Sequence, residues 1–149
     1  MWNLRSDSRL AAWREFRLSL DELSFDEAVA KTVHLWSYVP FVSHYLDVRD
    51  SQDWPTPWEL LADGKFDDMA KALGMLYTLA LTRHGKDHEF SIVRMSNTSS
   101  IENYNLVQID QGKYILNYVF DSVISNKQLE KDATVIQVYT SEDLHLTSY

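Results

Sequence analysis

The spacing of apolar residues along this chain changes once, between residues 85 and 89. In residues 1–85 the apolar positions recur at steps of three and four residues, the period of a helix buried on one face. In residues 89–140 they fall in short runs rich in β-branched and aromatic residues, as strands do. The pattern predicts a single α+β domain over residues 1–149, with a short tail at 141–149.

Four helices are predicted in the first half, at residues 7–20, 24 to about 40, 56 to about 62, and 66 to about 83. Two of their starts carry a capping box, in which a hydroxyl side chain and a glutamate three positions later cap each other's backbone amides. The two pairs are Ser24 with Glu27 and Thr56 with Glu59. Pro57 suits the first position of the third helix, where its missing amide costs nothing.

The fourth helical range has the broadest apolar face and is expected to be the central helix of the domain. Asp67 and Asp68 stand in its first turn, where the helix dipole favours negative charge. Gly74 is small enough to let another element pack closely against it. Gly85 follows the last apolar position and is expected to end the helix.

Strands are predicted at residues 89–95, 104–109, 113–120 and 134–140. The second and third are separated only by Asp110-Gln111-Gly112, a tight hairpin turn that makes them antiparallel. Residues 96–103 are polar and are expected to be a loop, and the polar residues 125–132 are expected to be helical or turn-like. The four strands should form a mostly antiparallel sheet packed on the central helix.

Composition narrows the function classes. The net charge is −8 and the 14 Lys and Arg residues form no run, so nucleic acid and anionic membranes are disfavoured as partners. The most apolar stretch, residues 69–81, is too short to span a bilayer. The chain has no cysteine, which removes disulfides, thiolate metal sites and thiol nucleophiles. Only 4 glycines are present and no phosphate-binding loop is found, so no cofactor is expected.

The segment Gly64-Lys65-Phe66-Asp67-Asp68-Met69-Ala70 opens the predicted central helix, and the strands at 104–109 and 113–118 follow it. This order resembles the core of the transglutaminase-like (papain-like) superfamily. There, a Gly-x-Cys-x-Asp-x-Ala pattern opens the helix, a second strand begins with His, and a Trp-led strand ends in Asp. Those three residues form a Cys-His-Asp triad, and the resemblance implies the same scaffold for this chain.

All three triad positions differ here. Phe66 stands in place of the cysteine, Tyr104 in place of the histidine, and Tyr118 in place of the aspartate, or Asn117 after a slip of one residue. The chemistry of the triad needs a thiolate, a base and a carboxylate that orients the base. The resemblance therefore implies a scaffold without its catalytic site, and we expect a protein that is not an enzyme.

The segment Trp54-Pro55-Thr56-Pro57-Trp58-Glu59-Leu60-Leu61, followed by this helix, resembles uncharacterised proteins of tailed bacteriophages. That resemblance implies a structural or assembly protein of the virion neck, tail or head–tail junction, found in the virion or the host cytoplasm. Its partners would be other virion proteins. The residues expected at the interface are Trp54, Pro55, Pro57 and Trp58, with Tyr149 in the terminal arm. The same aromatic turn could instead be a buried corner.

Two other function classes stay open. One is a hydrolase with a relocated site that uses Asp67, Asp68 or His84, although a helix N-terminus favours the ionised carboxylate and makes a poor general acid. His84 and His88 have zinc-ligand spacing only if they share a helix face, and Gly85 argues against that. The other class is a small phage regulatory protein that binds a host factor.

Overall fold

The computed structural model describes residues 1–97, 102–129 and 133–144. Its α-helices are α1 Ser6–Leu20, α2 Phe25–Ser37, α3 Pro57–Asp63 and α4 Asp68–Ala80. Its strands are β1 Phe90–Asn97, β2 Asn103–Ile109, β3 Tyr114–Leu116 and β4 Ala133–Tyr139. Short 3-10 helices lie at Ser51–Asp53, Arg83–Asp87, Asp110–Gly112 and Asn126–Gln128. Within these ranges no helix has the length and apolar character needed to cross a membrane.

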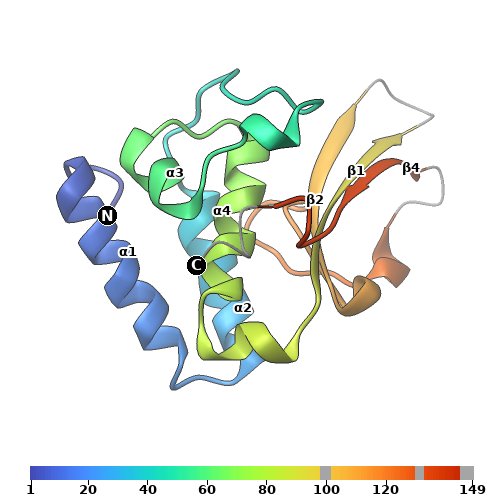
Figure 1. Cartoon of the computed structure of the whole chain (residues 1–149). Coiled ribbons are helices and arrows are strands. Elements are labelled where there is room, and N and C mark those ends of the chain that lie inside the picture. Colours follow the sequence, from blue (N-terminus) through green and yellow to red (C-terminus); the bar gives the residue numbers. More distant parts are fainter. Residues whose placement is uncertain (98–101, 130–132, 145–149) are drawn as a thin grey trace.

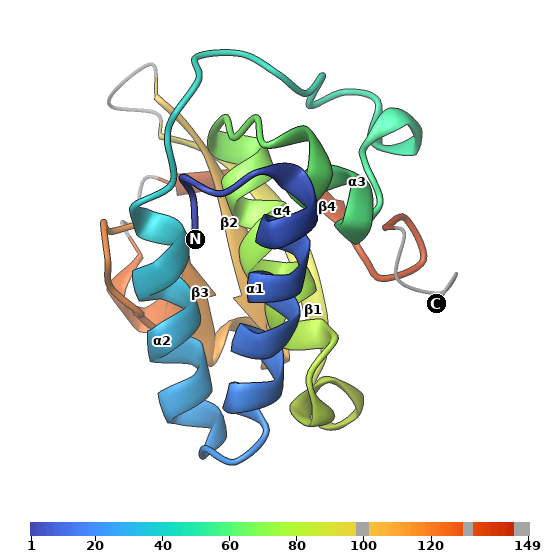
Figure 2. The ribbon, with the colours of Figure 1, turned by 90° about the vertical axis from the view of Figure 1, so that its left-hand side faces the viewer.

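The molecule has a helical layer on one side and a sheet on the other, with α4 between them (Figures 1 and 2). The strand order is β3-β2-β1-β4, and every neighbouring pair is antiparallel. Helix α4 contacts β1 and β2 on its sheet side and α2 and α3 on its other side. The predicted α+β class and the packing of the sheet on a central helix are confirmed.

Most of helix α4 is buried because it has neighbours on both sides. Trp13 of α1 and Trp36 of α2 are fully buried, and both indoles donate a hydrogen bond to the hydroxyl of Thr78 on α4. The Trp36 ring also lies directly over Gly74, where an added Cβ would come within 2.3 Å of it. The small residue in the middle of α4 therefore permits the close packing that the sequence predicted.

Both capping boxes are present as predicted, at Ser24 and at Thr56. Helix α4 begins two residues later than predicted, because the Asp67 side chain accepts the Ala70 amide and acts as its N-cap. It also ends earlier, at Ala80, and Gly85 lies in the following 3-10 helix, so the expectation that Gly85 ends α4 is wrong.

The third strand is shorter than its predicted range, 113–120. Strand β3 ends at Leu116 because Asn117 adopts a left-handed backbone conformation with φ of 67°. The chain then leaves the sheet and forms a loop over residues 117–122, in which Asp121 has φ of 51°. Asparagine and aspartate tolerate this conformation better than most residues, because their side chains can bond locally. This loop lies next to the head of α4 and forms part of the candidate site.

Candidate functional site

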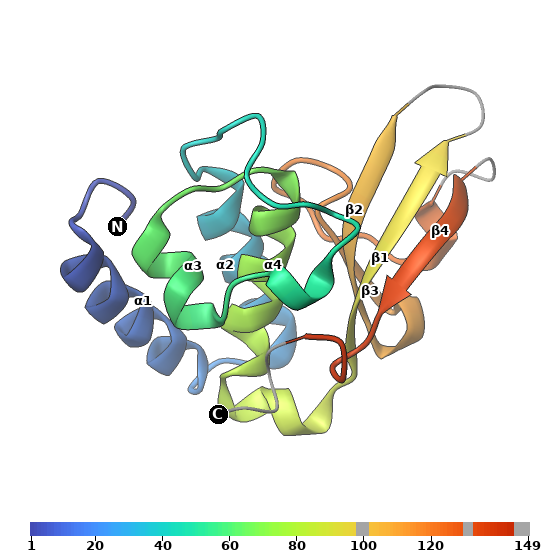
Figure 3. The same ribbon diagram turned by 45° about the horizontal axis from the view of Figure 1, so that its top comes forward.

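The segment between α2 and α3 passes over the N-terminal end of α4 (Figure 3). It is fixed there by Asp67, whose buried carboxylate accepts the backbone amides of Tyr45, Leu46 and Ala70, each at 2.8 Å. The Val42 amide adds a hydrogen bond to the carbonyl of Phe66 at 3.0 Å. One carboxylate therefore caps the helix and also holds the crossing segment, which gives the end of α4 a defined shape.

Three polar side chains from different elements meet at this end of α4. Asp68 is the first residue of the helix, Asn105 lies on β2, and Asn117 follows β3. Asn105 Nδ2 donates to Asp68 Oδ2 at 2.9 Å. Asn117 Nδ2 donates to Asp68 Oδ1 at 3.2 Å and to the backbone carbonyl of Asn105 at 2.8 Å. All three side chains are half-buried. We call this network the Asp-Asn-Asn cluster.

The cluster lies between two cavities. The first has a volume of about 240 Å³ and is lined by Asp68, Asn117 and Lys71, with Val33 and Met75 among its apolar residues. The second has a volume of about 360 Å³, shares Asp68 with the first, and is lined on its other side by residues of the crossing segment. The residues from that segment are Phe41, Ser43, His44, Leu46, Asp47, Val48 and Arg49. A carboxylate at the centre is thus accessible from two adjoining hollows.

Exposed aromatic side chains lie in or next to the linings of these cavities. Phe120 lines the first cavity and Phe41 lines the second, and their side chains are 62% and 64% exposed. Tyr38, at the end of α2, packs edge-on against Phe120 with ring centroids 5.3 Å apart. We call Tyr38, Phe41 and Phe120 the aromatic rim. Exposed aromatic residues beside a hollow are typical of protein-binding surfaces.

The loop of residues 117–122 forms one wall of the first cavity and is attached to α2. Asp121 accepts from the His34 ring at 3.0 Å and from the Tyr38 hydroxyl at 3.4 Å. Its backbone amide donates to the Ser37 hydroxyl at 3.2 Å. The two left-handed residues of this loop are therefore held in place by side-chain contacts, as strained segments at binding sites usually are.

Of the residues that replace the family triad in the sequence comparison, Phe66 lies apart from the two tyrosines. Phe66 is 1% exposed and packs edge-on against Trp2 and Trp36 in the main core. Tyr104 and Tyr118 pack against each other with ring centroids 5.0 Å apart, contact a second apolar cluster, and both line the first cavity. A hydrogen bond donated to Glu102, together with burial, raises the pKa of Tyr104. Phe66 therefore does not share a site with the two tyrosines, whereas Asn117, the alternative to Tyr118, belongs to the cluster.

The proposed interface residues at the aromatic turn are mostly inside the molecule. Trp54 is 3% exposed, donates to the Asp47 carbonyl at 2.7 Å and packs on Tyr139, and Pro55 and Pro57 are buried. The carbonyl of Pro55 accepts the Tyr77 hydroxyl at 2.9 Å. These three residues form the buried corner that the sequence left open, and they cannot serve as a docking surface. Trp58 is 39% exposed and stays a candidate, and Tyr149 lies outside the described residues.

The histidines and the acidic pair have separate environments. His84 lies within 3.1 Å of the Leu20 carbonyl, whereas His88 bonds Asp110 at 2.6 Å and stacks on Phe25. Among the residues that the structure describes, no group of three or more His, Asp or Glu is placed to hold a metal ion. Asp67 has the capping role that the sequence favoured, while Asp68 belongs to the cluster.

The fold is shared with solved structures of LapG from Legionella pneumophila. The calcium-bound form superposes with a TM-score of 0.71 at 13% sequence identity and covers 94% of this chain and 82% of that chain. A second LapG structure gives 0.70 at 14% identity, and the EGTA-treated form gives 0.70 at 15%, each covering 92% of this chain and 78% of LapG. No family model and no curated protein sequence matches this chain.

LapG has the transglutaminase-like (papain-like) cysteine protease fold, so the resemblance expected from the sequence holds at the level of the fold. At sequence identities of 13–15%, the similarity shows a shared arrangement of helices and strands and does not show a shared activity.

Proposed function

We propose that this chain is a non-catalytic binding domain that holds a segment of a partner protein across the head of α4. The observation that carries the proposal is the Asp-Asn-Asn cluster, which occupies the junction of α4, β2 and β3 between two cavities. The chain has no cysteine, so it cannot supply the thiolate that a transglutaminase-like protease uses. Neither asparagine can serve as a general base, because a carboxamide does not take up a proton near neutral pH.

The surroundings of the cluster suit a polypeptide ligand. Two adjoining cavities of about 240 and 360 Å³ can accept neighbouring side chains of one extended segment. The aromatic rim adds a large apolar contact area that costs little conformational entropy when it is covered. The net charge of −8 and the scattered basic residues argue for a protein partner over nucleic acid.

The proposal is tested by selecting binders from a random peptide library on the immobilised chain. The rim variant changes two residues of the aromatic rim, Tyr38→Ser and Phe120→Ser. The matched control is Leu18→Ser, which changes an apolar side chain of α1 that is 53% exposed. We expect the wild type and the control to retain the same peptides and the rim variant to lose them. Equal retention by all three proteins, or cleaved peptides in the eluate by mass spectrometry, would overturn the proposal.

The finer form of the proposal is a component of a tailed-phage virion, with other virion proteins as partners. It rests on the sequence resemblance of residues 54–61 and the helix that follows them. Co-purification with a head or tail protein encoded by a neighbouring gene is the expected result. Neighbouring genes that encode no virion protein would count against this form and would leave the binding-domain proposal in place.

A further inference from the structure

The hydrogen bonds of the cluster fix which polar atoms remain for a ligand. An ionised carboxylate can only accept, so both asparagines must turn their amide nitrogens toward Asp68. Asn117 also directs its nitrogen to the Asn105 carbonyl, which can only accept as well. The orientation of the two carboxamides is therefore set by their partners and not by the shapes of the side chains.

This arrangement leaves acceptors for the ligand. Within the described part of the chain, no donor reaches the carboxamide oxygen of Asn117, a residue that lines the first cavity together with Asp68. A carboxylate has about four lone-pair positions, and the two asparagines use one on each oxygen. A ligand group that bonds to these acceptor positions must donate hydrogen bonds, and a group that only accepts would have to bond to Lys71 or another donor of the cavity lining instead.

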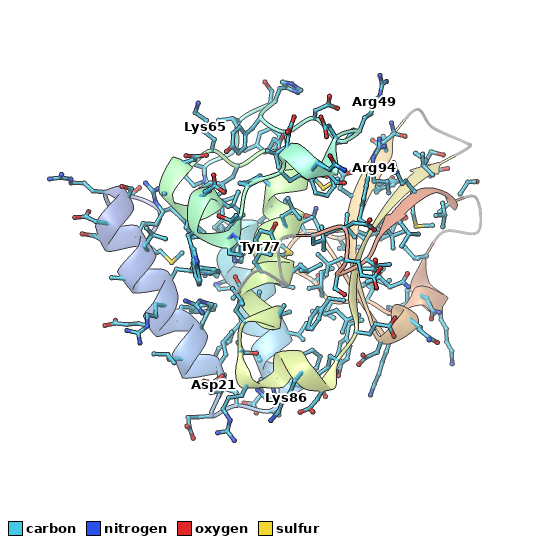
Figure 4. All side chains as sticks on the ribbon, viewed as in Figure 1. Asp21, Arg49, Lys65, Tyr77, Lys86 and Arg94 are labelled. Atoms are coloured by element: carbon cyan, nitrogen blue, oxygen red, sulfur yellow. The ribbon has the colours of Figure 1, made fainter. Side chains whose placement is uncertain are left out.

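The charges of the first cavity favour a cation. Its charged lining residues are Asp68, Asp121 and Lys71, which sum to one negative charge. Asp121 is already engaged by His34 and Tyr38, so Asp68 is the carboxylate without a charged partner. Lys71 forms no ion pair within the described residues and faces the same cavity. Arg49 lines the second cavity and Arg94 lines neither, and both lie at the end of the molecule where α4 begins (Figure 4).

An arginine side chain meets these requirements best. The guanidinium is a planar group with five N–H donors, which can serve Asp68 and the Asn117 oxygen together. Its face can stack on a ring such as that of Phe120 at the cavity mouth. A cavity of about 240 Å³ has room for roughly eight water-sized groups at about 30 Å³ each, close to the number of non-hydrogen atoms in an arginine side chain.

We infer that the first cavity binds an arginine of the partner's segment, with its guanidinium on Asp68 and Asn117. The inference rests on the proposed function and adds the chemical class of the ligand. It makes Lys71 an opposing charge that limits the affinity of the site.

The test uses peptides selected on the full chain, resynthesised with each arginine replaced by methionine, and measured by isothermal titration calorimetry. The protein variants are Asp68→Asn and Lys71→Met, and the control is Asp7→Asn, which removes the same charge from the exposed start of α1. Thermal melts establish that each variant is folded.

We expect one arginine whose replacement weakens binding to the wild type by about tenfold or more, as losing a charge-assisted hydrogen bond does. That replacement should have little effect on binding to D68N, and K71M should bind the original peptide up to about fivefold more tightly. The inference would be overturned, while the proposed function stands, if the wild type bound the methionine-substituted peptides as tightly as the original peptides. It would also be overturned if K71M bound the original peptides more weakly than the wild type does. A library that yields no binding peptide would overturn both.

Discussion

The hydroxyl of Thr78 is the point at which three helices are joined by polar contacts. It accepts the indole N–H of Trp13 from α1 and that of Trp36 from α2, each at 2.9 Å, and it donates to the Gly74 carbonyl at 2.6 Å. The side chains of Trp13, Trp36 and Thr78 are all 0% exposed. Water therefore cannot replace the hydroxyl if it is removed.

Thr78→Val keeps the shape of the side chain and removes the acceptor. Two buried N–H groups then lose their partner, and each costs about 1–3 kcal/mol in free energy of unfolding. The methyl that replaces the hydroxyl recovers part of this by avoiding desolvation of a polar group, so we expect a net loss of about 3 kcal/mol. That is a large fraction of the roughly 5–15 kcal/mol by which domains of this size are stable.

The assay is equilibrium unfolding in urea, followed by circular dichroism and by tryptophan fluorescence. Thr78→Ser is the matched control, because it keeps the hydroxyl and removes one buried methyl group, at a cost of about 1 kcal/mol. T78V should therefore unfold at lower urea than T78S, with an unchanged slope. A T78V protein as stable as T78S would refute the claim that the hydroxyl satisfies both indoles.

Three further predictions concern other elements of the fold. Gly74→Ala should lower the free energy of unfolding despite a helix-propensity gain of about 1 kcal/mol, because the new Cβ would lie 2.3 Å from the Trp36 ring; urea unfolding with Ala30→Gly as the propensity reference checks the sign. Asp67→Ala should cost about 3 kcal/mol or more, since three backbone amides lose their acceptor, whereas Asp7→Ala, at an exposed position at the start of α1, should change stability by less than about 0.5 kcal/mol. Burial alone would raise the pKa of Asp110, but the Glu89 amide and the His88 ring lower it overall. The stabilisation from Asp110 is thus complete above its unfolded pKa of about 3.9 and is lost as the pH falls through its lower folded pKa. The free energies of unfolding of the wild type and Asp110→Asn should therefore converge in acid. A constant difference between them down to about pH 2 would contradict this.

Much of the fold could be predicted because its signals are local. A capping box needs only two residues three positions apart, and both boxes form where the sequence places them. The hairpin at residues 110–112 is likewise set by a few turn residues. The aromatic turn at Trp54 was ambiguous because its burial depends on Tyr77 and Tyr139, which are distant in sequence. The prediction that Gly85 ends α4 is wrong because the end of the helix depends on backbone contacts that a lone glycine does not specify.

The sequence does not predict the candidate site, because the residue at which α4 begins depends on contacts with residues distant in the sequence. The motif comparison counts residues from Gly64, but the helix starts where Asp67 finds the amides of Tyr45 and Leu46 as well as that of Ala70. This puts Asp68 at the head of α4 and Phe66 in the core. One signal was available in the sequence: Asn105 and Asn117 are polar residues in otherwise apolar strand patterns, and such residues are kept only where they find a partner.

The orientation of the two carboxamides bears on catalysis and on ligand choice together. Acyl-transfer enzymes stabilise a developing oxyanion with donors that point at the substrate, often carboxamide N–H groups. In this chain both carboxamides turn their N–H groups inward to Asp68, and Asp68 and Asn117 both line the first cavity. The polarity of the cluster is the reverse of an oxyanion hole, since a negatively charged intermediate at the cluster would meet acceptors and a carboxylate. A cation meets the same groups favourably, so one set of hydrogen bonds argues against acyl transfer and in favour of a guanidinium ligand.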